Sequence, residues 1–194
     1  MNASTCLPHD FYDRPTITVA RELLGMRLVR LLEGVRLAGL ISETEAYNGE
    51  EDLGCHARSG RTRRNAVMYG PPGFAYVYFT YGMHWMLNAV TQPEGFPAAV
   101  LIRAIRPVEG LDVITARRQG RDTLGPAKIT RALGIDESLN GADLCSPASG
   151  LWIEAGSAVA NGDILTGPRV GLYTVPEPWK SIPWRFRLKN EQSS

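Results

Sequence analysis

Two glutamates stand close together at the end of the apolar stretch RLAGLISETEAY. Side chains alternate between the two faces of a strand, so this pattern predicts that Leu37, Ile41, Glu43, Glu45 and Tyr47 share one face. A carboxylate at the end of an apolar face is partly desolvated, which raises its pKa and makes it a stronger base. The alternative is a strand end that emerges into solvent with both glutamates exposed.

A second stretch, FAYVYFTYGMHWMLN, predicts two antiparallel strands joined by a tight turn. Tyr76 and Tyr78 fall on one face of the first strand, and Asn88 lies on the return strand. Packing across strands is common for such residues and explains the two strand tyrosines in part. It does not explain Tyr81 and Met83, because an exposed turn usually carries Asn-Gly or Asp-Gly. Apolar side chains at such a tip can act as a wedge that enters a DNA groove and unstacks a base step.

Basic residues are clustered, although the net charge of the chain is only +1. The segment HARSGRTRRN places four arginines between Arg58 and Arg64, and 18 of the 21 basic residues are arginine. The forked guanidinium group suits phosphate recognition. A GC-rich genome produces the same arginine bias, so the cluster is compatible with nucleic-acid binding without establishing it.

Metal and cofactor chemistry have no recognisable motif in this chain. His9, His56 and His84 lack the spacing of a metal site, and a lone histidine such as His56 is more often a hydrogen-bonded structural residue than a catalyst. The three cysteines are scattered, which argues against a disulfide framework and fits a reducing compartment. Phosphate-loop, nucleophile-elbow and dinucleotide-binding signatures do not occur. We therefore expect neither a metal nor a cofactor.

Helices and strands must both contribute to positioning these residues. A proline near the start and a glycine at the end predict helices in RPTITVARELLG and LGPAKITRALGI. Strands are predicted on both sides of a turn at Glu33-Gly34, over 74–80, 84–90 and 98–105, and in GLWIEAG and RVGLYTV. The sum predicts an α+β fold with a curved, mainly antiparallel β-sheet core flanked by helices and a protruding β-hairpin.

Length and hydropathy predict one domain without a membrane anchor. The 194 residues fit a single domain over 1–194, in which 1–10 and 190–194 are expected to be flexible termini. No apolar run approaches the ~20 residues of a transmembrane helix, and the N-terminus lacks the features of a signal peptide.

Several segments, taken in order, resemble one known family. They are ARELLG, ISETEAYNGEED, HARSGRTRRN, YVYFTYGMHWMLN, VLIRAIRPVEG, GPAKITRALGI, RVG and PWRFRL, and they span about residues 15–190. Each is weak alone, but ETEAY, RN, YVYFTYGM and LIRA form a specific match in this order and spacing. The chain thus resembles the alkyladenine (3-methyladenine) DNA glycosylases of the vertebrate and bacterial alkyladenine type.

The resemblance implies a single DNA glycosylase domain that acts on double-stranded DNA as a monomer. Such an enzyme flips a damaged purine out of the duplex and hydrolyses its N-glycosidic bond, leaving an abasic site with no lyase step. The implied substrates are 3-methyladenine, hypoxanthine, ethenoadenine and 7-methylguanine. The implied location is the cytoplasm of a bacterium, at the nucleoid, or the nucleus of a eukaryote.

The resemblance also implies roles for individual residues. Glu45 is expected to activate the water, which Arg103 and the carbonyl of Val170 help to hold. Tyr47, His56 and Tyr78 are expected to form the pocket for the flipped base, where Asn88 would disfavour guanine by opposing the 2-amino group of that base. Tyr81 is expected to fill the place of the flipped base, with Met83 beside it. Contacts to the DNA backbone are expected from Arg61, Thr62, Arg63 and Lys128.

Two other functions compete with this one. A non-catalytic nucleic-acid-binding module of the same fold would need no carboxylate in a groove that faces phosphates, so Glu45 with Arg103 and His56 favours an enzyme. A glycoside hydrolase could use Glu43 and Glu45, whose side chains lie roughly 6–7 Å apart along a strand. Such enzymes usually draw their two acids from opposite sides of the substrate, which makes this a poor fit.

Overall fold

The computed structural model describes residues 5–189, so residues 1–4 and 190–194 of the termini expected to be flexible lie outside this range. Eight strands form one sheet: β1 Arg27–Leu32, β2 Val35–Asn48, β3 Ala75–Thr80, β4 His84–Val90, β5 Ala98–Glu109, β6 Leu151–Glu154, β7 Ile164–Gly167 and β8 Arg185–Leu188. Four α-helices accompany it: α1 His9–Tyr12, α2 Thr16–Glu22, α3 Leu111–Arg118 and α4 Pro126–Leu133. Short 3₁₀ helices occupy Ala66–Tyr69, Glu137–Leu139, Pro147–Ser149 and Asn161–Asp163.

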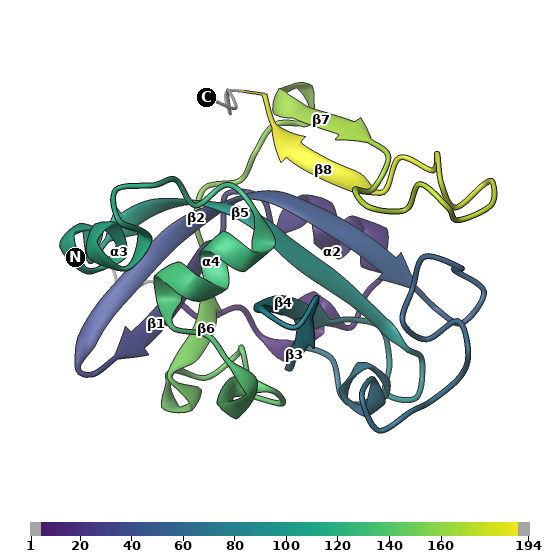
Figure 1. The fold of residues 1–194 in the computed structure, drawn as a ribbon, viewed down its shortest axis with the longest axis horizontal. Coiled ribbons are helices and arrows are strands. Elements are labelled where there is room, and N and C mark those ends of the chain that lie inside the picture. The colour runs from purple at the N-terminus through teal and green to yellow at the C-terminus, as the bar shows by residue number, and fades with distance from the viewer. Residues whose placement is uncertain (1–4, 190–194) are drawn as a thin grey trace.

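Strands β2 and β5 form the spine of the sheet and cross the molecule together (Figure 1). The strand order is β3-β4-β5-β2-β1-β6, and every strand pair is antiparallel. On the side away from β5, strand β2 pairs first with β1 and then, beyond Ser42, with β8. Strand β7 pairs with the other side of β8. The predicted α+β fold with a mainly antiparallel sheet is confirmed.

Local sequence signals account for several of these elements. Helix α4 has Pro126 in its first turn and Gly134 in the left-handed region after its last turn, as predicted. The β1–β2 hairpin turns at Glu33 and Gly34, whose φ values of 51° and 80° are those of a type I′ turn. No helix of the described residues is long and apolar enough to cross a membrane.

The interior is filled from both the helices and the sheet. Val19 and Ala20 of α2 and Ile129 and Leu133 of α4 lie in one buried cluster with apolar side chains from the sheet. Helix α3 was not predicted. Ile114 is its one buried apolar residue, and its sequence shows little of the apolar periodicity that marks a helix.

Two features of the chain differ from the sequence analysis. The RVGLYTV segment is predicted as a strand but forms turns, because its backbone and the Arg169 side chain bond to the β2 region instead of a sheet edge. Residues 5–10 are predicted to be flexible, yet the structure holds part of them against β6. Leu7 is buried, and its N–H donates to the carbonyl of Ile153 over 2.9 Å.

An irregularity in the β2–β5 ladder reverses the faces of β2. The pairing register skips Ser42 on one strand and Arg103 on the other, which is a β-bulge. Leu37 and Ile41 before the bulge belong to the same buried cluster as Ala46 after it. The glutamates and Tyr47 therefore face away from this cluster, and the prediction that they share a face with Leu37 and Ile41 is wrong.

A candidate active site between the β3–β4 hairpin and strands β2 and β5

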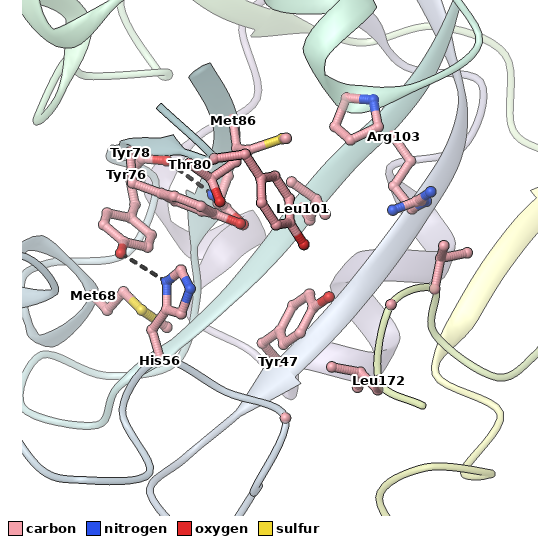
Figure 2. Close-up of a pocket in the computed structure, with 16 residues that line it drawn as sticks. Tyr47, His56, Met68, Tyr76, Tyr78, Thr80, Met86, Leu101, Arg103 and Leu172 are labelled. Carbon is pink, nitrogen blue, oxygen red and sulfur yellow. Dashed lines mark hydrogen bonds between the residues drawn. The ribbon is translucent and has the colours of Figure 1, made fainter. Parts of the chain in front are cut away.

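A cavity of about 330 Å³ lies where the bulged ends of β2 and β5 meet the β3–β4 hairpin. Its walls come from four strands, the loop after β2, the start of α4 and the loop after β7 (Figure 2). The lining residues are Tyr47, Gly54, His56, Met68, Tyr76, Tyr78, Thr80, Tyr81, Met86, Asn88, Leu101, Arg103, Pro126, Val170, Gly171 and Leu172. Seven of the residues for which the sequence analysis expected a role in the site thus line one cavity.

Glu45 lies directly behind this lining with its side chain fully buried. Its Oε1 accepts a hydrogen bond from the N–H of Val170 over 2.7 Å. Its Oε2 accepts one from the hydroxyl of Tyr47 over 2.8 Å and lies 3.4 Å from Nη1 of Arg103. Three residues that line the cavity therefore hold the carboxylate, and the alternative of two exposed glutamates is wrong.

Burial raises the pKa of Glu45 above its ordinary value. The charge of Arg103, the N–H of Val170 and the hydroxyl of Tyr47 oppose this effect, because each stabilises the carboxylate form. The contact with Val170 is made through its N–H. The part expected of its carbonyl, to hold a water, stays a prediction.

Glu43 has a different environment from Glu45. Its Oε1 accepts hydrogen bonds from Nε of Arg103 over 2.9 Å and from Nε of Arg185 over 2.6 Å. Two guanidinium groups of the protein thus occupy this carboxylate oxygen, so it is engaged within the protein and not free to face a substrate. This arrangement argues against a pair of cooperating acids and makes Glu43 a support for Arg103.

Aromatic rings form the wall opposite Tyr47 (Figure 2). The rings of Tyr76 and Tyr78 lie on one face of β3, as predicted, with centroids 5.2 Å apart. His56 packs edge-on against Tyr78 at 4.5 Å, and its Nδ1 lies 3.0 Å from the hydroxyl of Tyr76. His56 is an exposed residue at the edge of the cavity, but its ring packs against Tyr76 and Tyr78 and is desolvated on that side. This desolvation, with Arg64 and Arg58 nearby, lowers the pKa of His56 to about 4. The ring is therefore neutral at physiological pH.

Asn88 is buried in the wall of the cavity, on β4. Its Nδ2 donates to the carbonyl of Tyr76 on the neighbouring strand over 3.0 Å. This bond fixes the amide, so a group that enters here meets a rigid polar surface.

The tip of the β3–β4 hairpin is exposed beside the cavity. Tyr81 has 83% of its surface exposed and Met83 68%, and Tyr81 also lines the cavity. Tyr81 and Gly82 have φ values of 52° and 65°, the signs that a type I′ turn requires. A left-handed conformation is unfavourable for tyrosine, so the turn keeps an aromatic residue where asparagine would fit better.

Arg61, Thr62 and Arg63 are exposed on the loop after β2. This loop is organised by buried Asn65, whose amide donates to the carbonyls of His56 and Gly60. Lys128, in the first turn of α4, forms an exposed ion pair with Asp122 at 2.8 Å. A phosphate would have to compete with Asp122 for this lysine.

Arg169 is a site residue that the sequence analysis missed. Its guanidinium group is buried against Asp52, donates to the carbonyl of Ala46 over 3.0 Å and lies 4.7 Å from the ring centroid of Tyr47. Arg169 precedes Val170, so these contacts hold the loop that bonds Glu45. The position of RVG at the start of a predicted strand does not reveal such a pairing, because its partner Asp52 is 117 residues away.

The cavity has no converging set of metal ligands among the described residues. Among residues 5–189, three side chains that can bind a metal converge away from the cavity: His9, Asp143 and Cys145.

Comparison with known proteins decides the family. The sequence profile of the methylpurine-DNA glycosylases matches residues 10–192. The chain belongs to this family. It is a DNA glycosylase, an enzyme of base-excision repair, and its substrate is DNA.

Individual relatives agree over nearly the whole chain. A protein of Methanocella arvoryzae is 51% identical over 95% of this chain and 92% of its own length. Proteins of Carboxydothermus hydrogenoformans and Myxococcus xanthus are 49% and 45% identical, over 96% of this chain and over 96% and 91% of their own lengths. All three bear the name "Putative 3-methyladenine DNA glycosylase". The glycosylase resemblance inferred from the sequence is confirmed, and the non-catalytic binding module is not supported.

Proposed function

We propose that this glycosylase hydrolyses the N-glycosidic bond of alkylated or deaminated purines with a water that Glu45 activates. The water oxygen bonds to C1′ of the deoxyribose, and its proton passes to the Glu45 carboxylate. The C1′–N bond breaks and its electron pair leaves with the base, which produces an abasic site. The transition state resembles an oxocarbenium ion, so the negative carboxylate also stabilises it electrostatically.

One observation carries this proposal: the buried carboxylate of Glu45 lies behind an aromatic-walled cavity, within reach of three groups that line it. At about 330 Å³, the cavity falls at the small end of the ligand-pocket range of ~300–1,000 Å³. A water that bonds Glu45 has to enter between Tyr47, Arg103 and Val170. Catalytic hydrogen bonds often rearrange when substrate binds, and the hydroxyl of Tyr47 is the group best placed to give way.

The pocket favours a cationic purine. In this proposal Tyr47 stacks on one face of the flipped base, and His56 and Tyr78 contact it from the other side. The faces of aromatic rings attract cations by up to ~2 kcal/mol when water is excluded. A neutral His56 adds no repulsion, which fits 3-methyladenine, whose nucleoside carries a positive charge. The fixed amide of Asn88 would clash with the 2-amino group of guanine. Hypoxanthine, ethenoadenine and 7-methylguanine are further proposed substrates, and 7-methylguanine, which keeps the 2-amino group, should be the poorest of them.

The hairpin and the basic residues would hold the distorted duplex. Tyr81 would fill the gap that the flipped nucleotide leaves, with Met83 against the neighbouring base step, and Arg61, Thr62, Arg63 and Lys128 would contact phosphates. Flipping a nucleotide out of the duplex costs a few kcal/mol, and it costs less when the base is damaged. This difference contributes to selectivity. The enzyme would act as a monomer, in the cytoplasm at the nucleoid.

The experiment incubates the protein with a duplex that carries one 3-methyladenine or hypoxanthine and then cleaves abasic sites with alkali. We expect strand breaks with the wild type and a loss of at least ~10²–10⁴-fold for Glu45→Gln, with DNA binding retained. Glu51→Gln is the matched control, because it removes an equal charge from an exposed position just beyond β2. Full activity of Glu45→Gln would overturn the role of Glu45, and no break with any of the four lesions would overturn the substrate assignment.

A further inference from the structure

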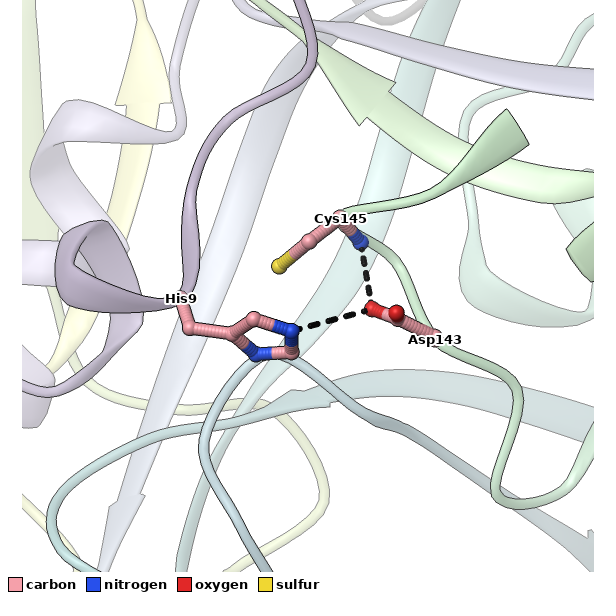
Figure 3. Close-up of side chains that lie close together, drawn as sticks. All are labelled: His9, Asp143 and Cys145. Atoms are coloured by element: carbon pink, nitrogen blue, oxygen red, sulfur yellow. Dashed lines mark hydrogen bonds and ion pairs between the residues drawn. The ribbon is translucent and has the colours of Figure 1, made fainter. Parts of the chain in front are cut away.

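His9, Asp143 and Cys145 converge at a surface site outside the cavity lining (Figure 3). His9 belongs to α1, and the other two residues come from the loop that precedes β6. One ligand atom from each side chain, an imidazole nitrogen, a carboxylate oxygen and a thiol sulfur, lies within 4.8 Å of the other two.

The imidazole of His9 is held in a defined orientation. Its Nδ1 lies 2.8 Å from the carbonyl of Pro72, which can only accept, so Nδ1 carries the hydrogen. The ring also stacks on Phe74 with a centroid distance of 5.6 Å. Nε2 lies 3.5 Å from a carboxylate oxygen of Asp143. A backbone carbonyl that binds one ring nitrogen and directs the other to a metal is the usual support of a histidine ligand.

Asp143 and Cys145 are likewise oriented by the backbone. Oδ1 of Asp143 accepts a hydrogen bond from the N–H of Cys145 over 2.8 Å, which brings two ligands of one short loop together. Gly73 leaves the space in which the cluster converges. A Cβ at this position would lie 2.8 Å from Sγ of Cys145 and 2.9 Å from Nδ1 of His9.

We propose that His9, Asp143 and Cys145 bind one zinc ion, with a fourth position left for water. Imidazole, carboxylate and thiolate are all zinc ligands, and the mixture of a soft sulfur with nitrogen and oxygen disfavours magnesium and calcium. Donor atoms around a tetrahedral zinc lie about 3.5 Å from one another, so small side-chain rotations bring the cluster to bonding distance. The sequence analysis expects no metal, because these ligands lie on segments far apart in the chain.

The ion would join the N-terminal segment to the body of the protein. Leu7, two residues before His9, already bonds to Ile153 of β6. A cation that links α1 to the loop before β6 would reinforce this attachment, since a ligand that binds only the folded state stabilises it.

The test titrates Co²⁺, a spectroscopic substitute for zinc, into the full chain and then displaces it with Zn²⁺. We expect one equivalent to produce the near-ultraviolet absorption of a cobalt–thiolate bond, and zinc to raise the melting temperature. Cys145→Ser should abolish the absorption, and Asp143→Asn or His9→Phe should weaken Co²⁺ binding. His9→Phe keeps an aromatic ring to stack on Phe74.

Cys6→Ser is the matched control, because Cys6 lies near Cys145 but outside the cluster. Its absorption should equal that of the wild type. The proposal is overturned if the wild type shows no thiolate absorption, if Cys145→Ser retains it, or if it disappears in Cys6→Ser. Any of these results would leave His9 and Asp143 as a surface contact without a metal. Base excision by Cys145→Ser should match the wild type, so this test is independent of the glycosylase mechanism.

Discussion

Arg169 and Asp52 form a bidentate ion pair in which both side chains are fully buried. Nη1 and Nη2 of Arg169 lie 2.5 and 2.8 Å from the two carboxylate oxygens, which also accept the N–H groups of Asn48 and Gly54. The pair ties the loop before Val170 to the end of β2. It therefore supports the hydrogen bond between Val170 and Glu45 without touching the cavity itself.

Asp52→Asn should destabilise the protein by ~3–5 kcal/mol, because it leaves the Arg169 charge buried without its counter-charge. Urea-induced unfolding measures the loss. Glu22→Gln breaks the exposed Arg14–Glu22 pair and is the control, with an expected cost below about 1 kcal/mol. Equal losses of unfolding free energy for the two variants would show that the buried Arg169–Asp52 pair contributes no more to stability than the exposed Arg14–Glu22 pair.

Tyr47→Phe should move the acid limb of the pH–rate profile to higher pH. The Tyr47 hydroxyl lowers the pKa of Glu45, so its removal raises this pKa, and a base that must be deprotonated then becomes active only at higher pH. The pH dependence of kcat/KM for excision of 3-methyladenine from pH 5 to 9 measures the shift, because kcat/KM reports the free enzyme, in which the hydroxyl bonds Glu45. The values should converge with the wild type at the alkaline end. Tyr69→Phe, which removes a hydroxyl bound to Glu50, should leave the profile in place. Movement of the alkaline limb to higher pH, with the acid limb unchanged, would mean that Glu45 acts in its protonated form.

Tyr81→Asn should separate stability from function. Asparagine tolerates the left-handed conformation, so the hairpin should gain up to about 1 kcal/mol. Excision from duplex DNA and binding to abasic DNA should fall, whereas activity on single-stranded substrate falls less. The control is Glu33→Asn, in the β1–β2 turn, where φ is 51°. It should bring a similar gain in stability with unchanged activity. Equal losses on duplex and single-stranded DNA for Tyr81→Asn would make Tyr81 a structural residue.

Asp122→Asn should strengthen DNA binding if Lys128 contacts a phosphate. The lysine is held by Asp122 at 2.8 Å, and removal of this charge frees it for the DNA backbone. Lys128→Ala should weaken binding across sequences and reduce the slope of log K against log salt by about 1. Fluorescence anisotropy at several salt concentrations measures both variants. If Asp122→Asn strengthens binding equally in a Lys128→Ala background, its effect is general repulsion and Lys128 has no phosphate contact.

Features that depend on neighbouring residues could be predicted from the sequence. The Glu33-Gly34 turn, the boundaries of α4 and the β3–β4 hairpin follow from turn residues, caps and alternation, which act over a few positions. RVGLYTV also has a strand-like pattern, yet it forms turns. Its polar groups find stronger partners in β2 and Asp52 than a sheet edge offers.

The sequence by itself determined which residue types are available: the ETEAY carboxylates, the tyrosines of the hairpin and the arginine-rich loop, and with them the family. Only the tertiary structure decided how these groups are used. The bulge at Ser42 and Arg103 turns Glu45 away from the main core, and burial then separates it from Glu43, which two arginines hold. Tertiary structure also brings Arg169 to Asp52, and His9 to Cys145, from distant parts of the chain. Bulges, burial and contacts between distant segments arise from packing of the whole chain, and no local pattern encodes them.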